Sequence, residues 1–244
     1  MSGIIRLLPW AIVALITCTT SITFYLSYIK YEHVTYILPY ISDTGTFPPE
    51  SCIFGQGFNI GSALIAFAIY LKYLQVKEIY KKHHIEDKYN VNKLALILGL
   101  MASAGLNLVA NFQETNAFSI HWFGAILTFG VGSLYISFQC YVYIKISPVI
   151  GQRKLTMFRI LLSLVSAIGF IVCTVTAFRS YGEFKGKDVT KWQKEDGGFQ
   201  VHQISTITEW ITASSIIIYI SLFYEEFKRI TVKPLNISLE DGIA

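Results

Sequence analysis

The chain has 244 residues, of which 53% are hydrophobic and only 15% are charged, and its net charge is +4. A soluble domain usually carries about 25% charged residues, and a disordered chain combines high charge with low hydrophobicity. The composition therefore excludes both classes and predicts an all-α, polytopic membrane protein. Because the basic residues lie between apolar segments, rather than on one solvated face, we expect no nucleic-acid partner.

Six apolar segments follow one another along the chain. They cover about residues 7–29, 52–74, 94–111, 119–142, 159–178 and 203–224, each close to the roughly 20 residues that a membrane-spanning helix needs. The first segment is longer than the apolar core of a signal peptide, so we expect it to remain as a span. The sequence predicts a bundle of six transmembrane helices within residues 1–230 and a short cytosolic tail over 231–244.

The lysines and arginines predict the orientation of these spans. Fourteen of the 20 lie on the side that contains both termini, and six lie on the other side. Cytosolic segments carry an excess of Lys and Arg, so both termini are predicted to be cytosolic. The segments 30–51, 112–118 and 179–202 would then face the lumen or exterior, although the last carries five of the six cations on that side.

Two predicted spans place strongly polar side chains on one helix face. The spacing i, i+4, i+7 occurs in Asn107, Asn111 and Glu114 of the third span and in His202, Thr206 and Glu209 of the sixth. Such residues are costly inside a bilayer and usually face the protein interior, where they often carry function. Both sets lie toward the predicted lumenal side.

Two further segments would bring polar groups to the same edge. His121 opens the fourth span, and the short loop 112–118 places it next to Glu114. The segment LPYISDTGTFPPES, residues 38–51, contains three prolines, which exclude regular helix or strand, so this loop could cover the span ends with Asp43 and Glu50. We therefore predict a ligand site formed by Asp43, Glu50, Asn111, Glu114, His121, His202 and Glu209.

The residue types leave three uses of this cluster open. Histidine titrates near pH 6.5, which suits pH sensing in an acidic lumen, and the same groups could bind a lipid headgroup or small solute. Interhelical hydrogen bonds alone could also explain them. An enzyme would use His121, His202, Glu209, Glu114 and Asp43, and two histidines with one carboxylate would suit zinc. No H-E-x-x-H motif is present, so we expect no metal or cofactor outside that alternative.

Four stretches carry a family resemblance. LPYISDTGTFPPES, NLVANFQET, the single His121 and VHQISTITEW resemble the damage-regulated autophagy modulator (DRAM) family, from about residue 4 to residue 230. The stretch LTFGVGSLY is most similar to the second of two vertebrate paralogues, whereas the short tail ending SLEDGIA departs from it. The wider group includes GPI-anchor lipid-remodelling factors. The resemblance implies a six-span protein of lysosomal or late-endosomal membranes that promotes autophagy.

Three functional hypotheses follow. The first is a positive modulator of autophagy without catalysis of its own, whose lumenal pocket senses pH or binds a lipid or small solute, and whose partners are membrane lipids and autophagy proteins. The alternative is an intramembrane lipid hydrolase or acyl-transfer enzyme that uses the His and carboxylate cluster. The second alternative is a scaffold that recruits autophagy machinery through the loop 75–93.

Overall fold

The computed structural model describes residues 5–34, 38–150 and 152–231, and no strand occurs among them. Six helical segments in this part are long and apolar enough to cross a membrane: Leu8–Lys30, Glu50–Lys82, Val91–Asn111, Phe118–Ile150, Arg153–Glu183 and Phe199–Phe227. The predicted all-α bundle of six spans is confirmed. Almost all of the predicted tail, residues 232–244, lies outside the described residues.

Three of the six segments consist of more than one helical element. The first joins α2 (Leu8–Phe24) to the π-helical η1 (Tyr25–Lys30), the fourth joins α5 (Phe118–Ala125), the π-helical η3 (Ile126–Val131) and α6 (Gly132–Ile150), and the sixth joins α8 (Phe199–Ser221) to α9 (Tyr224–Phe227). The other three are α3 (Glu50–Lys82), α4 (Val91–Asn111) and α7 (Arg153–Glu183). Helices α3 and α7 extend past the predicted apolar ranges because a helix continues where its side chains become polar.

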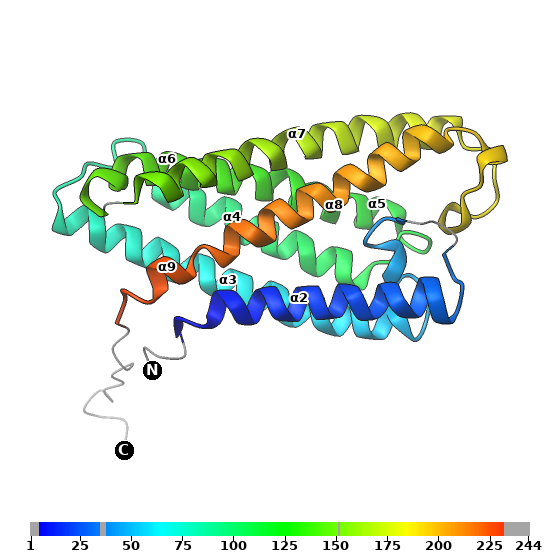
Figure 1. Ribbon diagram of the computed structural model, residues 1–244, viewed down its shortest axis with the longest axis horizontal. Helices are drawn as coiled ribbons and strands as arrows, with labels where there is room; N and C mark the ends of the chain where they lie inside the picture. Colours follow the sequence, from blue (N-terminus) through cyan, green and yellow to red (C-terminus); the bar gives the residue numbers. More distant parts are fainter. Residues whose placement is uncertain (1–4, 35–37, 151, 232–244) are drawn as a thin grey trace, which may run out of the picture.

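The helices form a closed ring. Each packs on its neighbour in the chain, with α3 between α2 and α4, α4 against η3 and α6, and α7 between α6 and α8, while α2 also contacts α8. Figure 1 shows the residues 31–34, 38–49, 112–117 and 184–198 at one end of the bundle, which we name the loop end. The connection 83–90, the start of α2 and the end of α9 lie at the opposite end, the terminal end.

The loop between α2 and α3 folds into the loop end instead of lying over it. Residues 39–46 are buried, except for the half-buried Ser42, and Asp43–Gly45 form the short 3-10 helix η2. The Trp210 indole Nε1 donates to the Pro39 carbonyl at 2.8 Å, and the Thr23 and Thr44 hydroxyls are hydrogen-bonded at 2.9 Å. The loop is therefore fixed to both α8 and α2.

Two glycines allow α4 and α5 to approach closely. A Cβ atom added at Gly105 would lie 2.7 Å from the Gly124 carbonyl oxygen and 2.8 Å from the Thr128 backbone nitrogen. Backbone atoms cannot move aside as the end of a flexible side chain can. Small residues at such contacts are typical of packed membrane helices, and Gly105 and Gly124 have this role between the third and fourth spans.

We predict that Gly105→Ala lowers the stability of the bundle. The added methyl group would force α4 and α5 apart, and overpacking of this kind typically costs about 1–3 kcal/mol. Gly182→Ala is the matched control, because nothing lies within 4 Å of a Cβ atom at this helical position. Thermal unfolding of the purified protein in detergent should show a lower midpoint for Gly105→Ala and an unchanged or slightly higher one for Gly182→Ala. Equal midpoints for the two variants would contradict the close contact.

Candidate ligand site at the loop end

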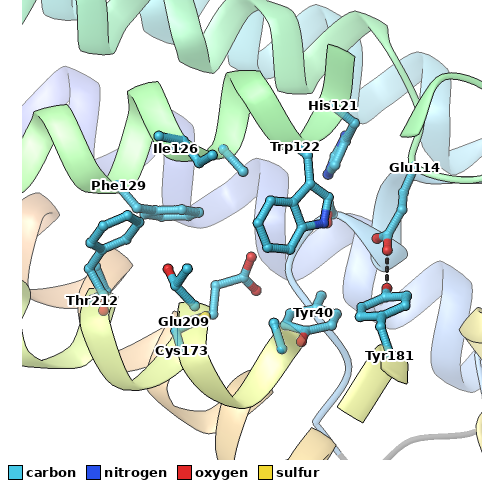
Figure 2. A pocket seen from close by; sticks show the side chains of 15 residues that line it. Tyr40, Glu114, His121, Trp122, Ile126, Phe129, Cys173, Tyr181, Glu209 and Thr212 are labelled. Atoms are coloured by element: carbon cyan, nitrogen blue, oxygen red, sulfur yellow. Dashed lines mark hydrogen bonds between the residues drawn. The ribbon is translucent and has the colours of Figure 1, made fainter. Parts of the chain in front are cut away.

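A cavity of about 70 Å³ lies at the loop end between α5, η3, α7, α8 and the α2–α3 loop. We name it the end cavity; Figure 2 shows the side chains that line it. Its polar lining residues include Tyr40, Ser42, Glu114, His121, Thr174, Tyr181, Glu209 and Thr212, and the other lining residues are mainly apolar. Three of the seven predicted site residues thus face one space.

Glu209 connects the cavity to the α2–α3 loop. Its side chain projects from α8, is 7% exposed, and its Oε2 atom accepts a hydrogen bond from the Ile41 backbone amide at 2.7 Å. In Figure 2 the carboxyl group points into the space between the α5–η3 segment and α7. The loop therefore determines where this buried carboxyl group lies.

Glu114 enters the cavity from a loop and not from a helix. Helix α4 ends at Asn111, so the prediction that Glu114 continues the helical face of Asn107 and Asn111 was wrong. The chain turns at residues 112–117, and this turn buries Glu114. The Tyr181 hydroxyl donates a hydrogen bond to Glu114 Oε1, as Figure 2 shows.

His121 lies in the first turns of α5 and is buried beside Glu114 in the cavity wall. Its Nδ1 atom is 2.7 Å from the Phe112 carbonyl oxygen. A carbonyl can only accept a hydrogen bond, so Nδ1 carries a proton and donates. This contact fixes the orientation of the ring at the cavity.

Asp43 lies behind the cavity wall. It is buried in η2, and its Oδ2 atom accepts a hydrogen bond from the Tyr40 backbone amide at 3.2 Å. Burial raises the pKa of Asp43 well above its usual value, and the nearby carboxylates of Glu114, Glu209 and Asp188 raise it further. Asp43 is therefore a loop carboxyl group whose protonated form is favoured by the fold.

His202 is also behind the wall, next to Tyr40. Its ring stacks on Trp192 with the centroids 4.0 Å apart and meets the Tyr40 ring edge to face at 5.1 Å. The ring is 1% exposed and is not part of the cavity lining. His202 thus supports Tyr40, whose hydroxyl donates to Ser205 Oγ at 2.7 Å.

Glu50 and Asn111 make contacts elsewhere at the loop end. Glu50 Oε1 is 2.7 Å from His33 Nδ1, and both residues are outside the cavity lining. The Asn111 amide donates to Asn59 Oδ1 at 2.8 Å in a network between α3 and α4 that also includes Asn107. Asn107 and Asn111 are exposed on the outer surface of the bundle, so helical spacing did not show which face turns inward.

The zinc alternative required His121, His202 and Glu209 to converge. In residues 5–34, 38–150 and 152–231 no group of three or more His, Cys, Asp or Glu side chains could hold a metal ion. The physical reason is the position of His202, which is stacked on Trp192 outside the cavity that His121 and Glu209 share.

Several residues of this end were not among the predicted site residues. Tyr40, Trp122, Cys173 and Tyr181 all line the end cavity, and His33 pairs with Glu50. Tyr181 lies beyond the predicted fifth span, in the part of α7 that extends past the apolar segment. The histidine at 33 could have been found from its place in a predicted lumenal loop.

A second space, the central cavity, adjoins the end cavity. It has a volume of about 250 Å³ and is lined mainly by apolar side chains from five of the six spans. The two cavities share the lining residues Ser42, His121, Ala125, Phe129 and Glu209. The buried polar groups of the end cavity, among them Glu114, His121 and Glu209, therefore lie beside a larger and mainly apolar cavity in the interior of the bundle.

Comparison with known proteins places the chain in a family. The family model described as Frag1/DRAM/Sfk1/Cwh43P N-terminal domain matches residues 4–230. DNA damage-regulated autophagy modulator protein 2 of Bos taurus is 37% identical over 235 residues, covering 93% of this chain and 85% of the relative. The human DNA damage-regulated autophagy modulator protein 1 is 32% identical, covering 90% of this chain and 91% of the relative.

A more distant relative is the modulator of macroautophagy TMEM150B-B of Xenopus laevis, 29% identical over 78% of this chain and 71% of its own length. No solved structure matches the chain. The resemblance to the DRAM family is confirmed, with higher identity to protein 2 than to protein 1. The chain therefore belongs to the Frag1/DRAM/Sfk1/Cwh43P family.

Proposed function

We propose that this chain is a multi-pass protein of lysosomal or late-endosomal membranes that positively modulates autophagy, with both termini in the cytosol. Its relatives are named as DNA damage-regulated autophagy modulators and as a modulator of macroautophagy. We further propose that the end cavity and the central cavity together bind one amphipathic lipid. The observation that carries this second step is that buried carboxyl and imidazole groups line the small end cavity, and that this cavity adjoins a larger, mainly apolar cavity inside the same bundle.

The sizes of the two cavities favour a lipid over a small solute. The end cavity of about 70 Å³ has room for only a few polar atoms, since one water takes about 30 Å³. The central cavity of about 250 Å³ is close to the lower limit of typical ligand pockets and is mainly apolar. A lipid with a small polar head beside Glu209 and His121 and one alkyl chain in the central cavity would occupy both cavities.

The lipid proposal predicts the effect of filling the central cavity. Ala213 lines it, so Ala213→Phe should displace the alkyl chain and reduce the lipid that co-purifies with the protein about tenfold or more, a change of about 1.4 kcal/mol. Ile211→Phe is the matched control, because Ile211 on the same helix is 43% exposed on the outer surface. Mass spectrometry of lipid extracts from the two purified variants gives the measurement. A small solute would need only the end cavity and would not be affected by this change. If the same amount of lipid co-purifies with Ala213→Phe as with the wild type, the lipid proposal is refuted.

The role of the polar head contacts can be tested at Glu209. Glu209→Gln keeps the side-chain shape and an oxygen that accepts from the Ile41 amide, but removes the ability of the side chain to ionise. We expect this variant to reach the same membranes as the wild type and to raise autophagic flux by less than half as much. Glu195→Gln makes the same chemical change at an exposed loop-end position outside both cavities. Wild-type flux from Glu209→Gln would reject a functional role for this carboxyl group.

A pH-sensing role is favoured by the surroundings of Asp43. This carboxyl group is buried close to two others, Glu114 and Glu209, and the raised pKa of Asp43 means that folding favours its protonated form. Its contribution to stability is fully present below the unfolded value of about 3.9 and is lost as the pH rises through the folded pKa. An acidic lumen would therefore stabilise this end of the bundle.

We predict that the protein unfolds at a higher temperature at pH 5 than at pH 7.5. Asp43 accounts for at most about 1.4 kcal/mol per pH unit, and Asp43→Asn, which stays neutral, should remove that part of the dependence. Thermal unfolding in detergent between pH 4.5 and pH 8 checks this, with Glu195→Gln as a control that keeps the wild-type slope. A slope that is the same in Asp43→Asn would show that Asp43 does not act as the sensor.

A further inference from the structure

The largest of the three cavities lies at the terminal end, at the opposite end of the bundle from the end cavity. It has a volume of about 500 Å³ and is formed by α3, the end of α6 and the segment around α9. It shares no lining residue with the end cavity or the central cavity. We name it the basic cavity because three cations line it, Lys72, Lys82 and Arg229, against two carboxylates, Glu78 and Glu226.

One buried carboxylate at this cavity forms ion pairs with two buried cations. Lys72 Nζ donates to Glu226 Oε2 at 2.9 Å, and Arg159 Nη2 donates to Glu226 Oε1. The side chains of Lys72 and Arg159 are 0% exposed, and that of Glu226 is 4% exposed. The three side chains together carry one unit of positive charge that is removed from water, and a buried charge is unfavourable without an opposite one.

The described residues compensate this charge only in part. The ring of Tyr143 lies under both cations, 3.7 Å from the Arg159 guanidinium carbon and 4.4 Å from Lys72 Nζ. The Nε and Nη1 atoms of Arg159 have no hydrogen-bond partner there. A ring face attracts a cation but carries no net charge, so the excess positive charge remains.

The exposed cations at the rim add to this excess. Within residues 5–34, 38–150 and 152–231, neither Lys82 nor Arg229 forms an ion pair. Counting Arg159 behind the wall, four cations face two carboxylates around one space. The basic cavity therefore attracts an anion.

We propose that the basic cavity binds the phosphate of an acidic phospholipid headgroup. The cavity lies where α3 and α6 end, and its uncharged lining residues are mainly apolar, with Leu74 39% exposed. Apolar side chains make no favourable contact with a free anion. They can contact the glycerol and the first part of the acyl chains of a phospholipid. The volume is within the range of about 300–1,000 Å³ that is typical of ligand pockets, and clusters of Lys and Arg at membrane edges attract anionic lipids.

The test titrates the purified full chain in neutral detergent micelles with dioctanoyl phosphatidylinositol 4-phosphate. We expect saturable binding to the wild type and at least tenfold weaker binding to the double variant Lys82→Ala/Arg229→Ala. Both side chains are exposed, so their removal leaves the buried contacts of Glu226 intact. The matched control is Lys77→Ala/Lys81→Ala, which removes two exposed cations of α3 outside the cavity and should bind within twofold of the wild type.

Three outcomes would overturn the proposal. Equal losses in the two double variants would mean general surface attraction without a site. Equally tight binding of dioctanoyl phosphatidylcholine would mean that the cavity recognises the chains and not the charge. Competition by inorganic phosphate at the same concentration as the lipid would show that the ligand is a free anion. None of these outcomes depends on the loop-end cavities, so this proposal and the proposed function can fail separately.

Discussion

The hydrogen bond from the Ile41 amide to the Glu209 carboxyl group holds the loop end together. A buried carboxyl group in a membrane bundle needs a donor, and a loop that enters the bundle has backbone amides that need acceptors. Here the Ile41 amide supplies the donor and the Glu209 carboxyl group supplies the acceptor. The loop is held in place, Tyr40 and Ser42 face the end cavity, and the ring of helices is closed at this end by a segment with three prolines.

The two ends of the bundle have opposite charge imbalances. At the loop end, Asp43, Glu114 and Glu209 are all buried, and the pKa of Asp43 is raised because burial and its neighbours oppose its ionisation. At the terminal end, the buried cations Lys72 and Arg159 share Glu226. A carboxyl group can relieve such an imbalance by taking up a proton. Arginine cannot give one up at any ordinary pH, so while Lys72 is also charged the terminal end attracts an anion.

The sequence was sufficient for the spans because hydropathy is a local property and the bilayer fixes the length. It was also sufficient to place His202 and Glu209 on one helix, since α8 runs without interruption from Phe199 to Ser221. Helical spacing gave the wrong position for Glu114 because α4 ends three residues earlier. Whether a polar face turns inward depends on packing against other helices, and spacing alone could not show that Asn111 is exposed while Glu209 is buried.

Lateral contacts explain why His202 and His121, both buried and both at the loop end, have different roles. His202 lies against Trp192 of the long α7–α8 connection, so its ring fills space between aromatic side chains. His121 follows a tight turn, which brings the Phe112 carbonyl within hydrogen-bond distance and leaves the ring at the wall of both cavities. A histidine that is oriented by a backbone carbonyl presents its second nitrogen in a fixed direction. The stacked ring of His202 instead contributes packing against its aromatic neighbours. In the proposed complex with an amphipathic lipid, His121 and Glu209 would therefore contact the head, and His202 would act on that head only through Tyr40.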